Sequence, residues 1–201
     1  MATELWNDAK FYKSYEIIGG KKIMAPAPNP THGGVIGRLY MFIGNYLDAN
    51  DSGYVFGDNT DVRFPDGTLL KPDLSVVLEK NSAVINWRRG IFGVPDMVVE
   101  VLSRSTRKRD LTIKKDIYEA QGVKEYWIVD PWMKSIDVYL LRDGKYFLDE
   151  EYVLFDAEAD AKDLEWLENV GKLDQIKHEV PVKILDGLTI PLKEIFKWGY
   201  K

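Results

Sequence analysis

Residues 95–131 read PDMVVEVLSRSTRKRDLTIKKDIYEAQGVKEYWIVDP. An apolar strand over residues 97–102 is followed by a basic loop, a helix over 110–121 and a second apolar strand over 125–129. This strand–helix–strand order predicts a crossover connection and at least one parallel pair of strands. We therefore expect an α/β (α+β) fold in which a mixed sheet, with helices packed on it, is centred on this stretch.

Glu100 lies in the middle of the first apolar strand. Because strand side chains alternate, it shares a face with Asp96 and Val98. A carboxylate in an apolar strand is costly to bury unless it meets a metal ion, a cation or hydrogen-bond donors. Glu100 is therefore either a metal ligand or a core acid paired with Arg107 or Lys114. Asp96 lies about 13 Å away at the strand rise, too far to share an ion, and is interpreted as a residue of the strand start.

A second acid, Asp73, follows Lys71 and Pro72 at the start of an apolar run over residues 74–78. Proline is tolerated at the first residue of a strand, so Asp73 is expected where this strand begins. The runs over 54–64 and 69–78 flank a Pro-Asp-Gly turn and predict a hairpin. Two strands that each bring one acid can form the oxygen site that a hard divalent cation prefers. Alternatively, Asp73 is a turn or cap residue.

Lys114 lies in the predicted helix. Leu111, Lys114, Tyr118 and Gln121 fall on one helical stripe, and the apolar neighbours on this stripe indicate that Lys114 points partly inward. Lys115 has no such neighbours and is expected in solvent. The alternative is that Lys114 is an ordinary surface lysine.

These features occur in an order that resembles the Uma-type family of restriction endonucleases, within the PD-(D/E)XK nuclease superfamily. The resemblance is carried by residues 15–20, 32, 71–73, 100–103, 110, 114, 118, 122–131, 186–191 and 195–196. It implies a restriction-endonuclease-like mixed β-sheet core flanked by helices, with extra β-hairpins. It also implies an endonuclease that hydrolyses phosphodiester bonds with Mg²⁺ or Mn²⁺ as cofactor.

The resemblance also implies the site residues. Asp73 and Glu100 would be catalytic metal ligands and Lys114 the catalytic lysine. In the superfamily pattern the lysine stands two residues after the acid, where this chain has Leu102. The resemblance suggests that the lysine has moved to the helix, at Lys114. Glu16 is either a third acid or a residue that caps the sheet.

His32 precedes a helical run that continues to residue 47. It is interpreted as a helix-start residue that could face the substrate.

The charge distribution bears on the partner. A net charge of −5 weighs against nucleic acid, because binding phosphates needs cations. However, residues 149–174 hold ten acids and two lysines, whereas residues 104–115 hold six basic residues and one acid. Local charge counts more than the total at ordinary salt. We therefore expect Arg104, Arg107, Lys108 and Arg109 to contact the phosphates of a nucleic acid, with double-stranded DNA as the expected substrate. The alternative is a solvated basic loop.

Length and composition predict the broad class. A chain of 201 residues predicts a single domain over residues 1–201, with an acidic helical insertion over 156–177. The absence of cysteine excludes disulfides and thiolate metal sites. No signal peptide or apolar stretch of about 20 residues is evident, so we expect a cytoplasmic protein without a membrane partner. Cleavage of both DNA strands would favour a homodimer.

Two non-enzymatic functions stay open at this point. The chain could be a catalytically inactive module that binds nucleic acid or a partner on a nuclease-like fold, because a fold does not fix a function. It could also be a structural protein whose acidic segment 149–174 contacts a partner.

The remaining patterns predict elements outside the central stretch. We expect hairpins at 15–18 with 22–24 and at 135–141 with 145–147, and a closing segment over 182–196. Residues 79–94, which include Arg88 and Arg89, are expected to form a polar connection.

Overall fold

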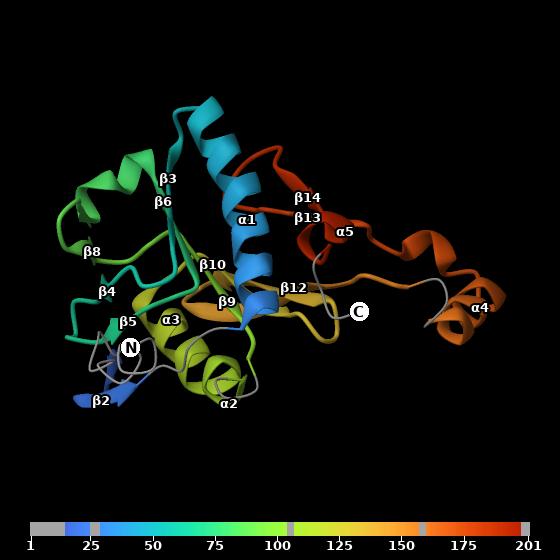
Figure 1. Cartoon of the computed structure of the whole chain (residues 1–201), viewed down its shortest axis with the longest axis horizontal. Coiled ribbons are helices and arrows are strands. Elements are labelled where there is room, and N and C mark those ends of the chain that lie inside the picture. The colour runs from blue at the N-terminus through green and yellow to red at the C-terminus, as the bar shows by residue number, and fades with distance from the viewer. Residues whose placement is uncertain (1–14, 25–28, 104–106, 157–159, 198–201) are drawn as a thin grey trace, which may run out of the picture.

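A computed structural model of the chain describes residues 15–24, 29–103, 107–156 and 160–197 (Figure 1). Its centre is a six-stranded mixed sheet with the order β12-β11-β10-β9-β6-β3. The strands are β3 (Gly53–Gly57), β6 (Leu74–Leu78), β9 (Met97–Val101), β10 (Glu125–Asp130), β11 (Ser135–Arg142) and β12 (Lys145–Val153). Strands β9 and β10 pair in parallel and the other neighbours are antiparallel. The predicted strand–helix–strand unit and the mixed sheet are confirmed.

The two faces of this sheet are covered by different layers. Helix α1 (Pro30–Ala49) packs on the face that carries Val99 and Val101, together with α5 (Leu192–Ile195). The opposite face, which carries Val98 and Leu102, packs against the helix that follows β9 and against a second sheet. The near-continuous apolar run of β9 is buried on both faces, as expected for a strand that is covered on both sides.

The helix after β9 has three parts. They are α2 (Arg107–Arg109), a π-helical turn η2 (Asp110–Lys114) and α3 (Lys115–Gln121). Gly122 ends it with a φ of 87°, which suits a residue without a β-carbon. The helix predicted over 110–121 is confirmed, but the π turn in its first half was not predicted. Such turns are rare and are frequent at functional sites.

The second sheet has the order β2-β1-β5-β4-β8-β7. Its strands are β1 (Tyr15–Ile18), β2 (Lys21–Met24), β4 (Val62–Arg63), β5 (Leu69–Leu70), β7 (Ile85–Asn86) and β8 (Gly90–Phe92). The predicted hairpin of β1 and β2 is present. Where the sequence predicted only a polar connection, a 3₁₀ helix η1 (Glu79–Val84) leads into the hairpin of β7 and β8.

The predicted hairpin over 54–64 and 69–78 has a different form. Its inner part, β4 with β5, belongs to the second sheet, whereas its outer part, β3 with β6, belongs to the central sheet. Both strands are interrupted between the sheets. Pro72 lacks an N–H for a ladder, and Asn59 has a φ of 70°. The interruption leaves the loop 58–61 and the segment 71–73 outside the ladders, and Asp73 lies in the second of these.

The C-terminal part is smaller. Helix α4 (Ala161–Asn169) lies within the acidic segment where the sequence predicted a helix, and in Figure 1 it stands away from the central sheet. A short 3₁₀ helix η3 (Leu173–Gln175) and the hairpin of β13 (Glu179–Pro181) and β14 (Thr189–Pro191) follow. Within the described ranges, no helix is long and apolar enough to cross a membrane.

Candidate active site

Glu100 lies in β9, and Asp73 directly precedes the neighbouring strand β6. Leu74 of β6 pairs with Val99 of β9, so the residues one step beyond this pair, Asp73 and Glu100, face each other across the two strands. The backbone N–H of Val101 donates a hydrogen bond of 2.7 Å to Asp73 Oδ2. This bond fixes the first carboxylate beside the strand that carries the second.

His32 also contacts Asp73. Its Nε2 lies 3.1 Å from Asp73 Oδ2, and its backbone N–H donates to the side chain of Asn29, which caps helix α1. Burial lowers the pKa of His32, but the hydrogen bond to Asp73 and the charges of Asp73 and Asp58 outweigh it, so the pKa is raised overall. The first turn of α1 therefore brings an imidazole nitrogen within hydrogen-bonding distance of Asp73.

Glu100 is buried, with 2% of its surface exposed. Its Oε1 accepts hydrogen bonds from Lys114 Nζ at 2.9 Å and from the Tyr118 hydroxyl at 2.6 Å. Burial raises the pKa of Glu100 well above its usual range; the charge of Lys114 opposes this rise, and the neighbouring acids add to it. The carboxylate is thus held by two donors in a site crowded with acids.

Lys114 is the cation at the centre of these acids. Its Nζ lies 2.9 Å from Glu16 Oε1 and 3.6 Å from Asp110 Oδ1, in addition to Glu100. Burial lowers the pKa of Lys114, but the three carboxylates outweigh this and raise it, so the lysine stays charged. The π turn contributes here because it directs both Asp110 and Lys114 to the buried side. The inward direction predicted for Lys114 agrees with this placement.

Glu16 joins the site from the second sheet. Its Oε1 accepts the backbone N–H of Lys71 at 3.2 Å, and its Oε2 lies 3.7 Å from an Arg109 guanidinium nitrogen. Glu16 is 2% exposed. The acid therefore ties β1 both to the segment before Asp73 and to the helix that carries Lys114.

The donor set fits a hard divalent cation. Asp73, just before β6, and Glu100 of β9 offer carboxylate oxygens, the type of ligand that such a cation prefers, and the surrounding acids outnumber Lys114. In the described part of the chain, no group of three or more acidic or histidine side chains is arranged to hold a metal ion together. An ion would therefore take two carboxylates and complete its shell with carbonyl oxygens and water, as Mg²⁺ commonly does.

The residues predicted to contact phosphates differ in their exposure and in their partners. Arg107 pairs with Asp130 at the end of β10 and keeps about half of its side chain exposed. Lys108 is exposed, whereas the side chain of Arg109 is largely buried and turned toward Glu16. Arg104 lies outside the described residues. Arg107 and Lys108 are thus the ones placed to meet a ligand from solvent.

A comparison with protein families matches residues 10–168 to Uma2, described as "Putative restriction endonuclease". The chain belongs to the Uma2 family. The site residues described above, from Glu16 to Tyr118, all lie inside the matched range. No curated protein matches the chain significantly.

A solved structure shares the fold of this Uma2 member. It is the crystal structure of "a putative nuclease belonging to DUF820" from Anabaena variabilis, with a TM-score of 0.67 and 20% sequence identity over 92% of this chain and 91% of that one. The likeness confirms the predicted restriction-endonuclease-like architecture of a mixed sheet flanked by helices.

Sequence reasoning missed one acid near the site of this Uma2 protein. Asp58 lies in the loop between β3 and β4, and partial burial together with the charge of Asp73 raises its pKa. It also contributes to the raised pKa of His32. The sequence did carry a signal for Asp58, because this acid directly follows β3. Strand β3 pairs with β6, and β6 begins directly after Asp73. Tyr118 was placed on the stripe of Lys114, but its bond to Glu100 was not foreseen.

Proposed function

We propose that this protein is a metal-dependent endonuclease that hydrolyses phosphodiester bonds in DNA. The observation that carries the proposal is the buried group in which Asp73, just before β6, lies opposite Glu100 of β9 while Lys114 contacts Glu100 at 2.9 Å. Membership of the Uma2 family supports a nuclease function. Lys114, which the resemblance implied as the catalytic lysine, therefore lies within hydrogen-bonding distance of Glu100.

The cation would be Mg²⁺ or Mn²⁺, held by Asp73 and Glu100. When bound, such an ion lowers the pKa of a bound water and neutralises charge that develops on the phosphoryl group. His32 and the Val101 N–H hold Asp73 in place through the same oxygen. Tyr118 holds Glu100. These bonds fix both carboxylates before a substrate arrives, which is what preorganisation requires.

Lys114 would act on the reacting phosphate. An ammonium group carries three donors and a positive charge, so it can stabilise the negative oxygens of the transition state. Its charge is secured by the surrounding carboxylates. Lys114 would thus share its donors between Glu100 and a phosphoryl oxygen.

Arg107 and Lys108 would contact the substrate backbone beside this centre. Such contacts position a duplex without reading its sequence. Double-stranded DNA is the proposed substrate, and a homodimer would allow both strands to be cut.

The test is cleavage of a supercoiled plasmid with Mg²⁺ or Mn²⁺. The wild type should nick or linearise the plasmid, and Asp73→Asn, Glu100→Gln and Lys114→Met should each lower the rate by about 10²–10³. Lys115→Met is the matched control, because it removes the neighbouring lysine that does not contact Glu100. Plasmid retardation without cleavage by the wild type would contradict the proposal and favour the binding module.

A further inference from the structure

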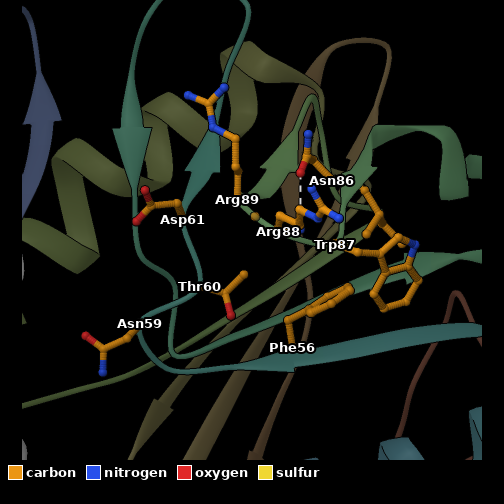
Figure 2. A pocket seen from close by; sticks show the side chains of 10 residues that line it. Phe56, Asn59, Thr60, Asp61, Asn86, Trp87, Arg88 and Arg89 are labelled. Atoms are coloured by element: carbon orange, nitrogen blue, oxygen red, sulfur yellow. Dashed lines mark hydrogen bonds between the residues drawn. The ribbon is translucent and has the colours of Figure 1, made fainter.

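A pocket of about 310 Å³ lies between the hairpin of β7 and β8 and the loop that follows β3. Figure 2 shows its wall, in which Trp87 and Phe56 lie on one side and Asp61 and Arg89 on the other. The volume is at the lower end of small-ligand sites, which run from about 300 Å³ upward. The pocket is separate from the buried group around Lys114.

Trp87 gives the pocket an aromatic surface. The residue is 70% exposed, yet its ring packs against Tyr54, edge-on at 5.1 Å between centroids, and against Phe56 at 6.1 Å. A single exposed apolar residue needs no explanation. An exposed indole that two other rings fix in position is a rigid platform on which a planar group can stack.

Two guanidinium groups follow directly in the chain. Arg88 and Arg89 line the same pocket, and the backbone N–H of Arg88 donates to the side chain of Asn86 at 3.1 Å (Figure 2). Arg89 also lies over the Phe92 ring, with its guanidinium carbon 5.3 Å from the centroid. Both side chains are exposed at the turn of the hairpin. The pocket thus joins a stacking surface to positive charge, the combination that binds single-stranded nucleic acid.

The pocket is next to the segment that carries Asp73. Lys71 Nζ donates to the carbonyl oxygen of Asn59 at 3.3 Å and pairs with Asp61 at 2.8 Å, and both of these residues line the pocket. Asp58, one residue before Asn59, is close enough to Asp73 for their charges to interact. One loop therefore has the pocket on one side and the candidate active site on the other.

We propose that this pocket binds an unpaired nucleotide of the substrate, with the base stacked on Trp87 and phosphates held by Arg88 and Arg89. The role in substrate binding rests on the nuclease function proposed above. Double-stranded DNA with an unpaired segment near the scissile phosphate would then bind more tightly than a uniform duplex.

The test is fluorescence anisotropy in EDTA with a fluorescein-labelled oligo(dT) single strand and a blunt duplex of the same length. Trp87→Ala should weaken oligo(dT) binding by about 5- to 150-fold, the range expected for losing one stacked base, and leave duplex affinity nearly unchanged. Trp87→Phe keeps a ring and should retain most of the affinity, which separates stacking from a folding defect. Trp166→Ala is the matched control, because Trp166 is 58% exposed on α4, and α4 lies at the opposite end of the molecule from β8 in Figure 1.

Salt dependence separates the two parts of the site. Arg88→Ala should reduce the slope of log affinity against log salt for oligo(dT) by about 0.7, as for one lost phosphate contact on a single strand. Trp87→Ala should leave that slope unchanged.

The inference is overturned if Trp87→Ala binds oligo(dT) as the wild type does, or if it weakens the duplex equally. Plasmid cleavage by the wild type tells this failure apart from failure of the nuclease function. If the wild type cleaves the plasmid and Trp87→Ala binds oligo(dT) as the wild type does, the pocket has no role in binding but the nuclease function stands. If Trp87→Ala weakens oligo(dT) binding but the wild type does not cleave the plasmid, the pocket binds nucleic acid and the nuclease function is wrong.

Discussion

Replacing Lys114 by methionine should destabilise the metal-free protein strongly. Lys114 is 4% exposed and its Nζ contacts Glu16 and Glu100 at 2.9 Å and Asp110 at 3.6 Å. Methionine fills similar volume but leaves these three buried acids without their shared cation. Removing one partner of a buried ion pair typically costs about 3–5 kcal/mol. In a protein of this size, each kcal/mol lowers Tm by about 2–4 °C, so the expected fall is about 6–20 °C.

The loss of stability caused by Lys114→Met should grow as the pH rises. Burial already raises the pKa of Glu100, and Lys114 is the neighbour that opposes this rise. In the Lys114→Met protein Glu100 therefore holds its proton more tightly in the folded state than in the unfolded chain. Stability then falls as pH rises above the usual carboxylate range. The wild type loses less, so the difference in Tm should be larger at pH 8 than at pH 5.

Thermal unfolding in EDTA, followed by circular dichroism at both pH values, measures this difference. Lys115→Met is the control, because Lys115 Nζ lies over the Tyr139 ring at 3.9 Å and its loss should cost about 0.5–1 kcal/mol. A Lys114→Met protein that melts with the wild type at pH 8 would refute the reasoning, since the acids would then need no cation.

Three further predictions concern single contacts. Tyr118→Phe removes a 2.6 Å hydrogen bond to a buried carboxylate and should lower the free energy of unfolding by about 1.5–3 kcal/mol in urea titrations; an unchanged midpoint would speak against that bond. The Glu125 carboxylate accepts hydrogen bonds from two backbone N–H groups and an indole N–H. Glu125→Gln replaces one acceptor oxygen by an amide NH₂, so at least one donor is left unpaired and the free energy of unfolding should fall by about 1–3 kcal/mol. A variant as stable as the wild type would show that these donors find other partners. Arg107→Ala should weaken binding to unrelated duplexes equally and reduce the salt slope by about 0.9, whereas a sequence-dependent effect would rule out a phosphate contact.

The central sheet could be predicted because its strands carry their own signals. The apolar runs around Val98 and Ile128, joined by a helical stripe, allow few other arrangements. Pro72 marked the start of a strand, and that placed Asp73 correctly. The alternation along β9 also put Glu100 on the face of Val98, where the structure has it beside Tyr118.

The parts that could not be predicted depend on contacts between distant segments. Asn59 has a left-handed φ, and the hairpin passes from the second sheet to the central sheet. This change of sheet depends on the other strands of both sheets, so the sequence of the hairpin alone does not predict it. The burial of Arg109 against Glu16 joins residues from β1 and α2, which no local pattern reveals. Glu125 is satisfied by backbone N–H groups almost sixty residues later in the chain, so its burial could not be inferred from its strand.

The most direct test of the account is the binding of Mn²⁺ itself, measured by electron paramagnetic resonance or calorimetry on the wild type, Asp73→Asn and Glu100→Gln. The account predicts binding by the wild type that either substitution abolishes, together with a rise in Tm on adding Mn²⁺ that only the wild type shows. Equal Mn²⁺ binding by the Glu100→Gln protein would contradict it, because the ion would then lie elsewhere.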